Sequence, residues 1–281
     1  MTQTVTRFAP SPTGRLHLGH AYSALFARRL ADAADGRFLL RIEDIDATRC
    51  KPEFEAGILE DLAWLGLRWE APVWRQSERM AVYAEALATL EARGLLYPCF
   101  CTRKDIAHEI AAAGHAPHGP EGPVYPGTCR SLGAAERTER IAAGTPFALR
   151  LHMEDAITAA GALTFTDRTA GRIAVDAAPF GDVVLARKEM PASYHLAVVV
   201  DDAAQGVTLV SRGEDLRPAT HVHRLLQALL GVPEPGYAHH RLLADAAGRR
   251  FAKRDRSLTL DALRAAGHSP AEVRRMAGIQ D

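Results

Sequence analysis

Short apolar runs alternate with amphipathic stretches over residues 1–96. Residues 5–8 and 37–42 are rich in apolar side chains and contain few breakers, which predicts two β-strands. Apolar residues recur at helical spacing over residues 53–65 and 77–93, and Gly94 predicts the end of the second helix. Another helix is expected between the two strands, to about residue 34. This strand–helix–strand order predicts a parallel, doubly wound α/β sheet.

The pattern changes over residues 97–174. Cysteines appear, residues 114–123 are rich in Gly, Pro and His, and only short strands such as 147–151 are predicted. We expect an inserted α+β subdomain here. Strands are predicted again at residues 182–185, 196–202 and 207–210, followed by a helix at 221–230 and a short helical tail at 257–281. Residues 1–96 and 175–256 would then form one discontinuous catalytic domain.

Composition narrows the class of protein. The chain has 281 residues, of which 47% are hydrophobic and 24% charged, as in an ordinary globular protein. Its apolar runs fall short of the roughly 20 residues of a membrane span, and its start lacks a signal-peptide pattern. We therefore expect a cytoplasmic protein with no membrane partner, and a monomer by default. Basic and acidic residues number 34 each, so net charge does not decide whether RNA is a partner.

Residues 7–20 place prolines, glycines and two histidines between the first strand and the first helix. Pro and Gly bend the backbone there, and a helix start offers unpaired N–H groups to an anion. His17 and His20 can each donate a hydrogen bond to a phosphate oxygen. A tight turn with incidental histidines is the alternative for the four residues His17 to His20 alone. The longer Pro/Gly context favours a nucleotide-binding turn.

Three further groups of side chains suggest binding chemistry. Glu43 directly follows the second strand, where it would hold a substrate ammonium or simply help form a turn. Arg212 follows a predicted strand and would bind a carboxylate or phosphate, with Tyr194 able to bind the same ligand; the alternative is an ordinary ion pair with Glu214 or Asp215. Lys253 lies in a basic loop that either stabilises a triphosphate or is simply a solvated surface.

Cysteines in a reduced compartment suggest a metal. Cys99, Cys101 and Cys129 supply three thiolates, one fewer than a closed tetrahedral zinc site needs. The candidate fourth ligands are His108, His115, His118 and Tyr125. Three buried cysteines without a metal are the alternative. A small, Gly-rich insertion gains stability from such a site, so we expect a structural zinc ion.

The order of these segments closely resembles the catalytic half of glutamyl-tRNA synthetase, a class I aminoacyl-tRNA synthetase. The segments are the turn at residues 7–20, Leu40-Arg41-Ile42-Glu43-Asp44-Ile45-Asp46, Tyr194-His195-Leu196-Ala197, Asp201-Asp202, Arg212-Gly213-Glu214-Asp215 and the basic loop. The resemblance spans nearly the whole chain and implies a Rossmann-like sheet with a zinc-containing insertion. It implies an ATP site formed by two segments. His17, Gly19 and His20 come from the turn at residues 7–20, and Lys253 comes from the basic loop. The glutamate pocket that it implies consists of Arg7, Ala9, Ser11, Glu43, Tyr194 and Arg212.

Two departures from that pattern indicate a subgroup of the family. The sequence ends soon after the basic loop, where a full synthetase continues into an anticodon-binding domain, and we expect no such domain here. The basic loop also differs from the second ATP-binding loop of the family: it has Arg where the family has its first lysine, and it lacks the family's serine. The chain looks more like the stand-alone paralogues that activate glutamate without tRNA and esterify it onto queuosine at the wobble position of tRNA(Asp). Their zinc ligands, three cysteines and a tyrosine, match Cys99, Cys101, Tyr125 and Cys129.

The resemblance implies a two-step reaction. The α-carboxylate of L-glutamate attacks the α-phosphate of Mg·ATP, with Mg²⁺ entering as the ATP complex; His17, His20 and Lys253 act on the phosphates. A hydroxyl of the RNA modification then attacks the mixed anhydride. Three alternatives remain: a truncated synthetase that glutamylates the tRNA 3′ end, a small-molecule nucleotidyltransferase, and a non-catalytic tRNA- or zinc-binding module.

Overall fold

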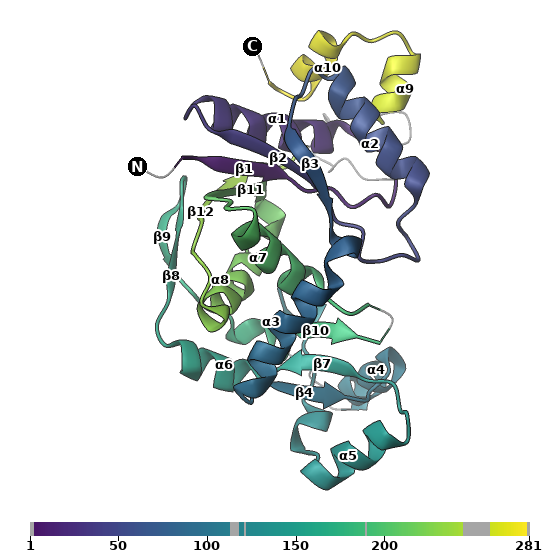
Figure 1. The fold of residues 1–281 in the computed structure, drawn as a ribbon, viewed down its shortest axis with the longest axis vertical. Coiled ribbons are helices and arrows are strands. Elements are labelled where there is room, and N and C mark those ends of the chain that lie inside the picture. Colours follow the sequence, from purple (N-terminus) through teal and green to yellow (C-terminus); the bar gives the residue numbers. More distant parts are fainter. Residues whose placement is uncertain (1–2, 113–117, 121, 189, 244–258, 280–281) are drawn as a thin grey trace.

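The computed structural model describes residues 3–112, 118–120, 122–188, 190–243 and 259–279. Its core is a parallel sheet drawn from distant parts of the chain. Strands β1 (Val5–Phe8), β2 (Arg37–Ile42) and β3 (Glu70–Arg75) pair in that order, and β11 (Leu209–Gly213) pairs with β12 (Gly236–His240), all in parallel. The Thr208 N–H donates to the Val5 carbonyl and so brings β11 beside β1 (Figure 1). The predicted parallel α/β sheet is confirmed.

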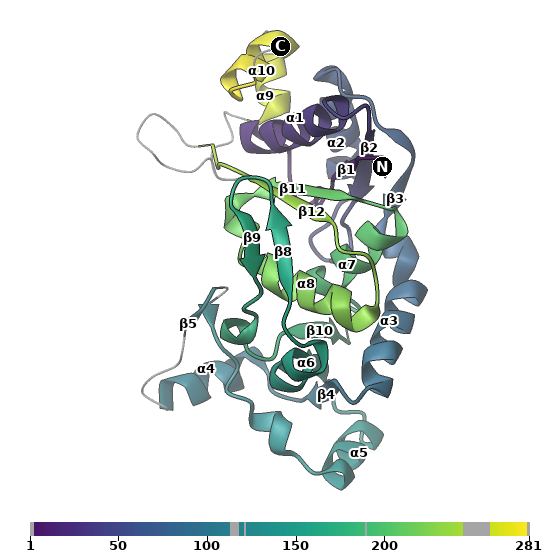
Figure 2. The same ribbon diagram turned by 90° about the vertical axis from the view of Figure 1, so that its left-hand side faces the viewer.

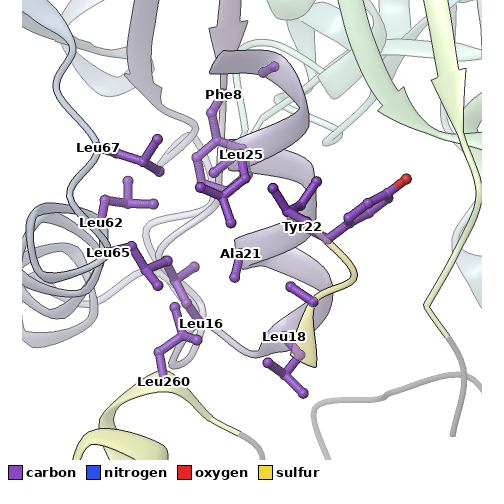
Figure 3. Packing of buried hydrophobic residues seen from close by; sticks show 14 of the residues in the cluster. Phe8, Leu16, Leu18, Ala21, Tyr22, Leu25, Leu62, Leu65, Leu67 and Leu260 are labelled. Atoms are coloured by element: carbon purple, nitrogen blue, oxygen red, sulfur yellow. The ribbon is translucent and has the colours of Figure 1, made fainter. Parts of the chain in front are cut away.

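Helix α1 (Leu18–Asp32) joins β1 to β2 and carries one side of the core. Its small and branched residues Ala21 and Leu25 are buried against Leu62 of α2 (Pro52–Trp64), as Figure 3 shows. The helical tail adds Leu260 of α9 (Leu260–Ala265) to the same cluster, and α10 (Pro270–Met276) follows it. The tail therefore packs on the helices of the catalytic sheet. None of the helices in the described ranges combines the length and apolar character that crossing a bilayer needs.

The prediction of a strand at residues 196–202 is wrong, because this segment belongs to helix α7 (Tyr194–Ala204). The Ser193 hydroxyl accepts the Leu196 N–H and caps the helix start. Val198, Val199 and Val200 are all buried, between α3 (Met80–Ala92) and α8 (Ala219–Leu230). A helix that is buried all round loses the amphipathic period, and its valines then imitate a strand.

The other predicted elements of the catalytic part are present with shifted ends. The helix expected at residues 77–93 begins with a 3-10 turn at Gln76–Arg79 and continues as α3. The strand expected at residues 207–210 extends to Gly213, so Arg212 lies within β11. The strand expected at 182–185 is β10 (Val184–Arg187).

A second, antiparallel sheet has the order β10–β7–β4, from β4 (Leu96–Cys99), β7 (Ala148–Leu151) and β10. The hairpin of β8 (Thr164–Asp167) and β9 (Gly171–Ala174) instead joins β12 of the parallel sheet (Figure 2). The remaining elements of this region are α4 (Arg103–Ala112), β5 (His118–Gly119), β6 (Gly122–Pro123), α5 (Ala134–Ala142), α6 (Met153–Ala160) and two 3-10 turns at Thr128–Ser131 and Ala178–Phe180. The exact domain limits stay a prediction.

Candidate active site

The start of α1 holds two histidines in fixed orientations. His17 Nδ1 accepts the Gly19 N–H at 3.1 Å, and His20 Nδ1 accepts the His17 N–H at 3.2 Å. Because Nδ1 is an acceptor in both rings, each neutral ring keeps its proton on Nε2, which is a donor. A Cβ on residue 19 would lie 3.0 Å from the His17 ring, so glycine leaves room for this cap. The predicted pair therefore presents two N–H donors beside a helix N-terminus.

One buried ion cluster joins β1, β2 and α7. Asp202 Oδ1 accepts from Arg7 Nε at 2.9 Å and from Arg41 Nη1 at 2.7 Å. Arg41 also donates to Glu43 Oε1 at 3.1 Å, and its Nε lies 3.8 Å from Asp201 Oδ2. Arg41 is completely buried, and Arg7 is 5% exposed. Two predicted pocket residues, Arg7 and Glu43, are thus brought together by two residues outside the predicted set.

The pKa values of the two carboxyl groups in this cluster shift in opposite directions. Burial alone would raise the pKa of Asp202, but Arg7 and Arg41 outweigh it and hold that pKa below its ordinary value. Burial raises the pKa of Glu43, and Arg41 and Arg7 only partly offset this. Glu43 therefore holds its proton more tightly than an ordinary glutamate does, in spite of its ion pair with Arg41.

A second cluster surrounds Arg212 on β11. Its Nη1 donates to Tyr194 Oη at 3.2 Å and contacts His223 Nδ1 at 3.0 Å. Its Nη2 donates to Thr220 Oγ1 at 2.6 Å, and its Nε donates to His239 Nε2 at 3.3 Å. All four acceptors are neutral groups. Within the described part of the chain, Arg212 forms no ion pair with a carboxylate, although it is only 6% exposed.

The loop after β1 carries the other predicted pocket residues. Ala9 is half-buried and Ser11 is exposed. Between them, the Pro10 carbonyl accepts the Glu43 N–H at 3.0 Å, which ties this loop to the end of β2. The structure therefore brings the loop next to Glu43, at the carboxyl edge of the parallel strands where open α/β sheets bind ligands.

Cys99, Cys101 and Cys129 form a compact cluster in the antiparallel part. Their three sulfur atoms all lie within 4.8 Å of one another. Cys101 Sγ lies 3.4 Å from Cys129 Sγ and 3.6 Å from Tyr125 Oη. Tyr125 Oη also accepts the Cys129 N–H at 2.8 Å. Three thiols and a phenol oxygen around one point fit a four-coordinate zinc ion, and Cys50 lies apart from them, near the Glu43 carbonyl.

A cavity of about 440 Å³ lies between the cysteine cluster and the Arg212 cluster. Tyr125 and Arg150 line one part of it, and Ser193, Tyr194 and His195 line another. Tyr194 is 36% exposed and reaches Arg212 through its hydroxyl. The cavity therefore reaches Tyr194, the residue whose hydroxyl contacts Arg212, from the side of the insertion.

Not every predicted residue can be placed, and some contributing residues were not predicted. Lys253 lies outside the described residues, as does His115. Arg41 carries a sequence signal, because a charged residue inside an apolar strand needs a buried partner. His223 and His239 carry none, since each comes from a helix or strand with its own packing pattern.

Comparison with known proteins gives consistent matches. The family model "tRNA synthetases class I (E and Q), catalytic domain" matches residues 3–278. A glutamyl-Q tRNA(Asp) synthetase of Rhodobacter capsulatus is 52% identical over 280 residues, which cover 98% of this chain and 100% of that protein. A protein of the same name from Nocardia farcinica is 47% identical over 95% of this chain and 81% of its own length.

A solved structure is similar as well. The crystal structure of a glutamate tRNA ligase from Elizabethkingia meningosepticum, in complex with its amino acid, superposes with a TM-score of 0.76. Sequence identity is 30%, and the match covers 90% of this chain and 52% of that one. The chain thus spans about half the length of that ligase and most of the length of the two relatives above.

Proposed function

Because the chain belongs to the class I tRNA synthetase family of glutamate and glutamine enzymes, and is thus a ligase of the aminoacyl-tRNA synthetase type, we propose that it activates L-glutamate with Mg·ATP in the absence of tRNA. The second step transfers the glutamate to queuosine at the wobble position of tRNA(Asp). The names of the relatives from Rhodobacter and Nocardia support this acceptor.

One observation carries the proposal for the amino acid. Arg212 is a buried cation whose described contacts are all neutral, and Glu43 is a buried carboxylate with its pKa raised. A buried charge is costly unless it is paired. Glutamate would supply a carboxylate to Arg212, which has none among the described residues, and an ammonium to Glu43 in addition to its ion pair with Arg41. Arg7, Ala9, Ser11 and Tyr194 would complete this pocket.

The chemistry of activation follows from the α1 end of the site. The glutamate α-carboxylate attacks the α-phosphate of Mg·ATP, so a P–O bond forms and pyrophosphate leaves. The Nε2–H donors of His17 and His20, with the N-terminus of α1 and Gly19, would stabilise the charge that builds up on the phosphates. We assign the same task to Lys253. Positioning and electrostatics supply most of the acceleration in such a displacement.

The acceptor would enter through the 440 Å³ cavity beside Tyr194. A hydroxyl of queuosine attacks the anhydride carbonyl there; an ester bond forms, the bond from the carbonyl carbon to the phosphate oxygen breaks, and AMP leaves with the bonding electrons while its phosphate takes up the hydroxyl proton. Cys99, Cys101, Tyr125 and Cys129 would hold a structural zinc ion, which stabilises the wall of the cavity to which Tyr125 belongs.

Glutamate-dependent exchange of labelled pyrophosphate into ATP, measured without tRNA, tests the first step. We expect exchange with L-glutamate and none with L-aspartate. Labelled glutamate is then offered to tRNA(Asp) with and without queuosine, and the labelled nucleotide is mapped. Label on the wobble nucleotide of the queuosine-containing tRNA alone supports the proposal. Label on the 3′ adenosine points to an ordinary charging enzyme, and the absence of exchange points to a binding module.

Metal analysis of purified protein tests the zinc site separately. We expect one zinc per chain in the unmodified protein and a loss of zinc in Cys129→Ala. Cys50→Ala is the matched control, because Cys50 lies outside the cluster, and should retain the metal. A full zinc content in Cys129→Ala would refute the proposed ligand set.

A further inference from the structure

The four hydrogen-bond contacts of Arg212 form a network in which its N–H donors determine the tautomers of both histidines. A guanidinium has donors and no acceptor. His239 Nε2 must therefore present its lone pair to Arg212, which places the ring proton on Nδ1. That nitrogen lies 2.6 Å from Asp167 Oδ2 and donates to it. Asp167 thus fixes the tautomer of His239 from the side away from Arg212.

Thr220 and His223 complete the network under the same rule. Thr220 Oγ1 accepts from Arg212 at 2.6 Å and lies 3.1 Å from His239 Nε2, whose lone pair it shares with the Arg212 N–H if it donates there. His223 Nδ1 accepts from Arg212, so its proton sits on Nε2 and is donated to His195 Nδ1 at 3.1 Å. Thr220 is completely buried, and His223 and His239 are 3% and 5% exposed. These acceptors orient three nitrogens of the guanidinium and add no negative charge.

We propose that Thr220, His223 and His239 are positioning residues for glutamate binding: they aim the guanidinium of Arg212 while leaving its charge for the substrate carboxylate. This inference rests on the proposed function, because it assigns supporting residues to the same pocket. Carboxylates in these three positions would orient Arg212 equally well but would neutralise it, and a substrate carboxylate would then compete with them.

The surroundings keep both histidines neutral. Burial lowers the pKa of His239 to about 4, with Arg212 and Arg217 acting in the same direction and Asp167 opposing. Burial also lowers the pKa of His223 well below its ordinary value, and the charge of Arg212 adds to this. A proton on either acceptor nitrogen would face an N–H of Arg212, so the arrangement excludes the charged form.

Steady-state pyrophosphate exchange by variants of this network is the test. Thr220→Val preserves shape and removes the acceptor of Arg212 Nη2. We expect the KM for glutamate to rise about tenfold to a hundredfold, the usual effect of losing a hydrogen bond to a charged group. The KM for ATP should change by less than about twofold, because the histidines assigned to the phosphates lie at the start of α1, outside this network.

Two variants of His239 separate positioning from folding. His239→Leu removes the acceptor and should raise the glutamate KM by a similar factor. In His239→Gln the side-chain oxygen takes the place of Nε2, so most of that loss should be recovered. His221→Leu is the matched control on α8, since His221 Nδ1 accepts only the Asp176 N–H among the described contacts, and it should leave the glutamate KM unchanged.

The outcomes distinguish this inference from the proposed function. If the unmodified protein shows no glutamate-dependent exchange, the proposed function itself fails. If exchange occurs and depends on Arg212, but Thr220→Val and His239→Leu keep the original glutamate KM, then the positioning role is refuted. Equal KM values for His239→Gln and His239→Leu, both raised, would also refute it, because the neutral acceptor would then not be what matters. If His239→Leu does not fold, Thr220→Val and His239→Gln still decide the question.

Discussion

The two buried arginine clusters of the site differ in whether carboxylates balance the charge of the arginines. In the first, Arg7 and Arg41 share Asp202, and Arg41 also reaches Glu43 and Asp201, so cations and carboxylates compensate one another. In the second, the described hydrogen-bond partners of Arg212 are a tyrosine, a threonine and two histidines, and its guanidinium also lies over the ring of Tyr237. The first cluster joins β1 and β2 to α7, and the second joins β11 and β12 to α8 and the start of α7.

This difference in charge balance suggests that one cluster contributes mainly to the stability of the fold and the other mainly to ligand binding. A compensated cluster stabilises the fold only while all its members are present, because removal of one member leaves another charge buried and unpaired. An uncompensated arginine costs free energy in the empty protein and recovers it when an anion binds. We therefore infer that the first cluster mainly builds the pocket and that the second mainly binds the substrate. Three substitutions test this division.

The largest effect is expected from Arg212→Met. The kcat/KM for glutamate in the exchange reaction should fall about a thousandfold or more, the usual result of removing one partner of a buried charge pair. The melting temperature should change little, since the partners left behind are neutral and the cost of burying the guanidinium disappears. Exchange kinetics and thermal unfolding of the same preparation check both halves. Activity within tenfold of the unmodified protein would contradict the assignment.

Arg41→Met should show the reverse pattern. It leaves Glu43 and Asp202 with fewer cationic partners in a buried setting, which costs about 3–5 kcal/mol. The expected fall in melting temperature is roughly 10 °C for a chain of this size. Arg28→Met is the matched control, because Arg28 pairs with Asp32 on the exposed side of α1 and should be nearly neutral. Equal melting temperatures for the two variants would remove the distinction between the clusters.

The sequence predicts those parts of the site that are local. Neighbouring residues are enough to predict the turn at residues 7–20, the carboxylate of Glu43 at the end of the second strand, and the three cysteines. Arg41 and Asp202 meet across 161 positions of sequence, and Asp167 and His239 across 72. No local pattern encodes such pairs, because they form only when the sheet assembles. The same limit explains the error at α7, where burial on all sides removed the helical period.

Asp61 of α2 shows how much an unpaired buried charge lowers the free energy of unfolding when no ligand binds to it. It is 1% exposed, neither carboxylate oxygen accepts a hydrogen bond from a described residue, and Arg264 Nη2 lies 3.7 Å away. Burial raises its pKa to about 6, although Arg264 opposes the shift. Since the folded protein binds this proton more tightly than the unfolded chain, folding stability decreases as pH rises from about 4 to about 6 and then levels off.

Asp61→Asn should remove that loss. Relative to the unmodified protein, the variant should gain about 1–2 kcal/mol more at pH 8, where Asp61 is ionised, than at pH 5, where it is mostly protonated. Urea unfolding at the two pH values measures this difference directly. Glu60→Gln is the neighbouring control, because Glu60 is exposed and pairs with the same Arg264. A stability difference that does not depend on pH would show that the Asp61 charge costs nothing, and would weaken the claim that Arg212 is held in a costly state until a carboxylate binds.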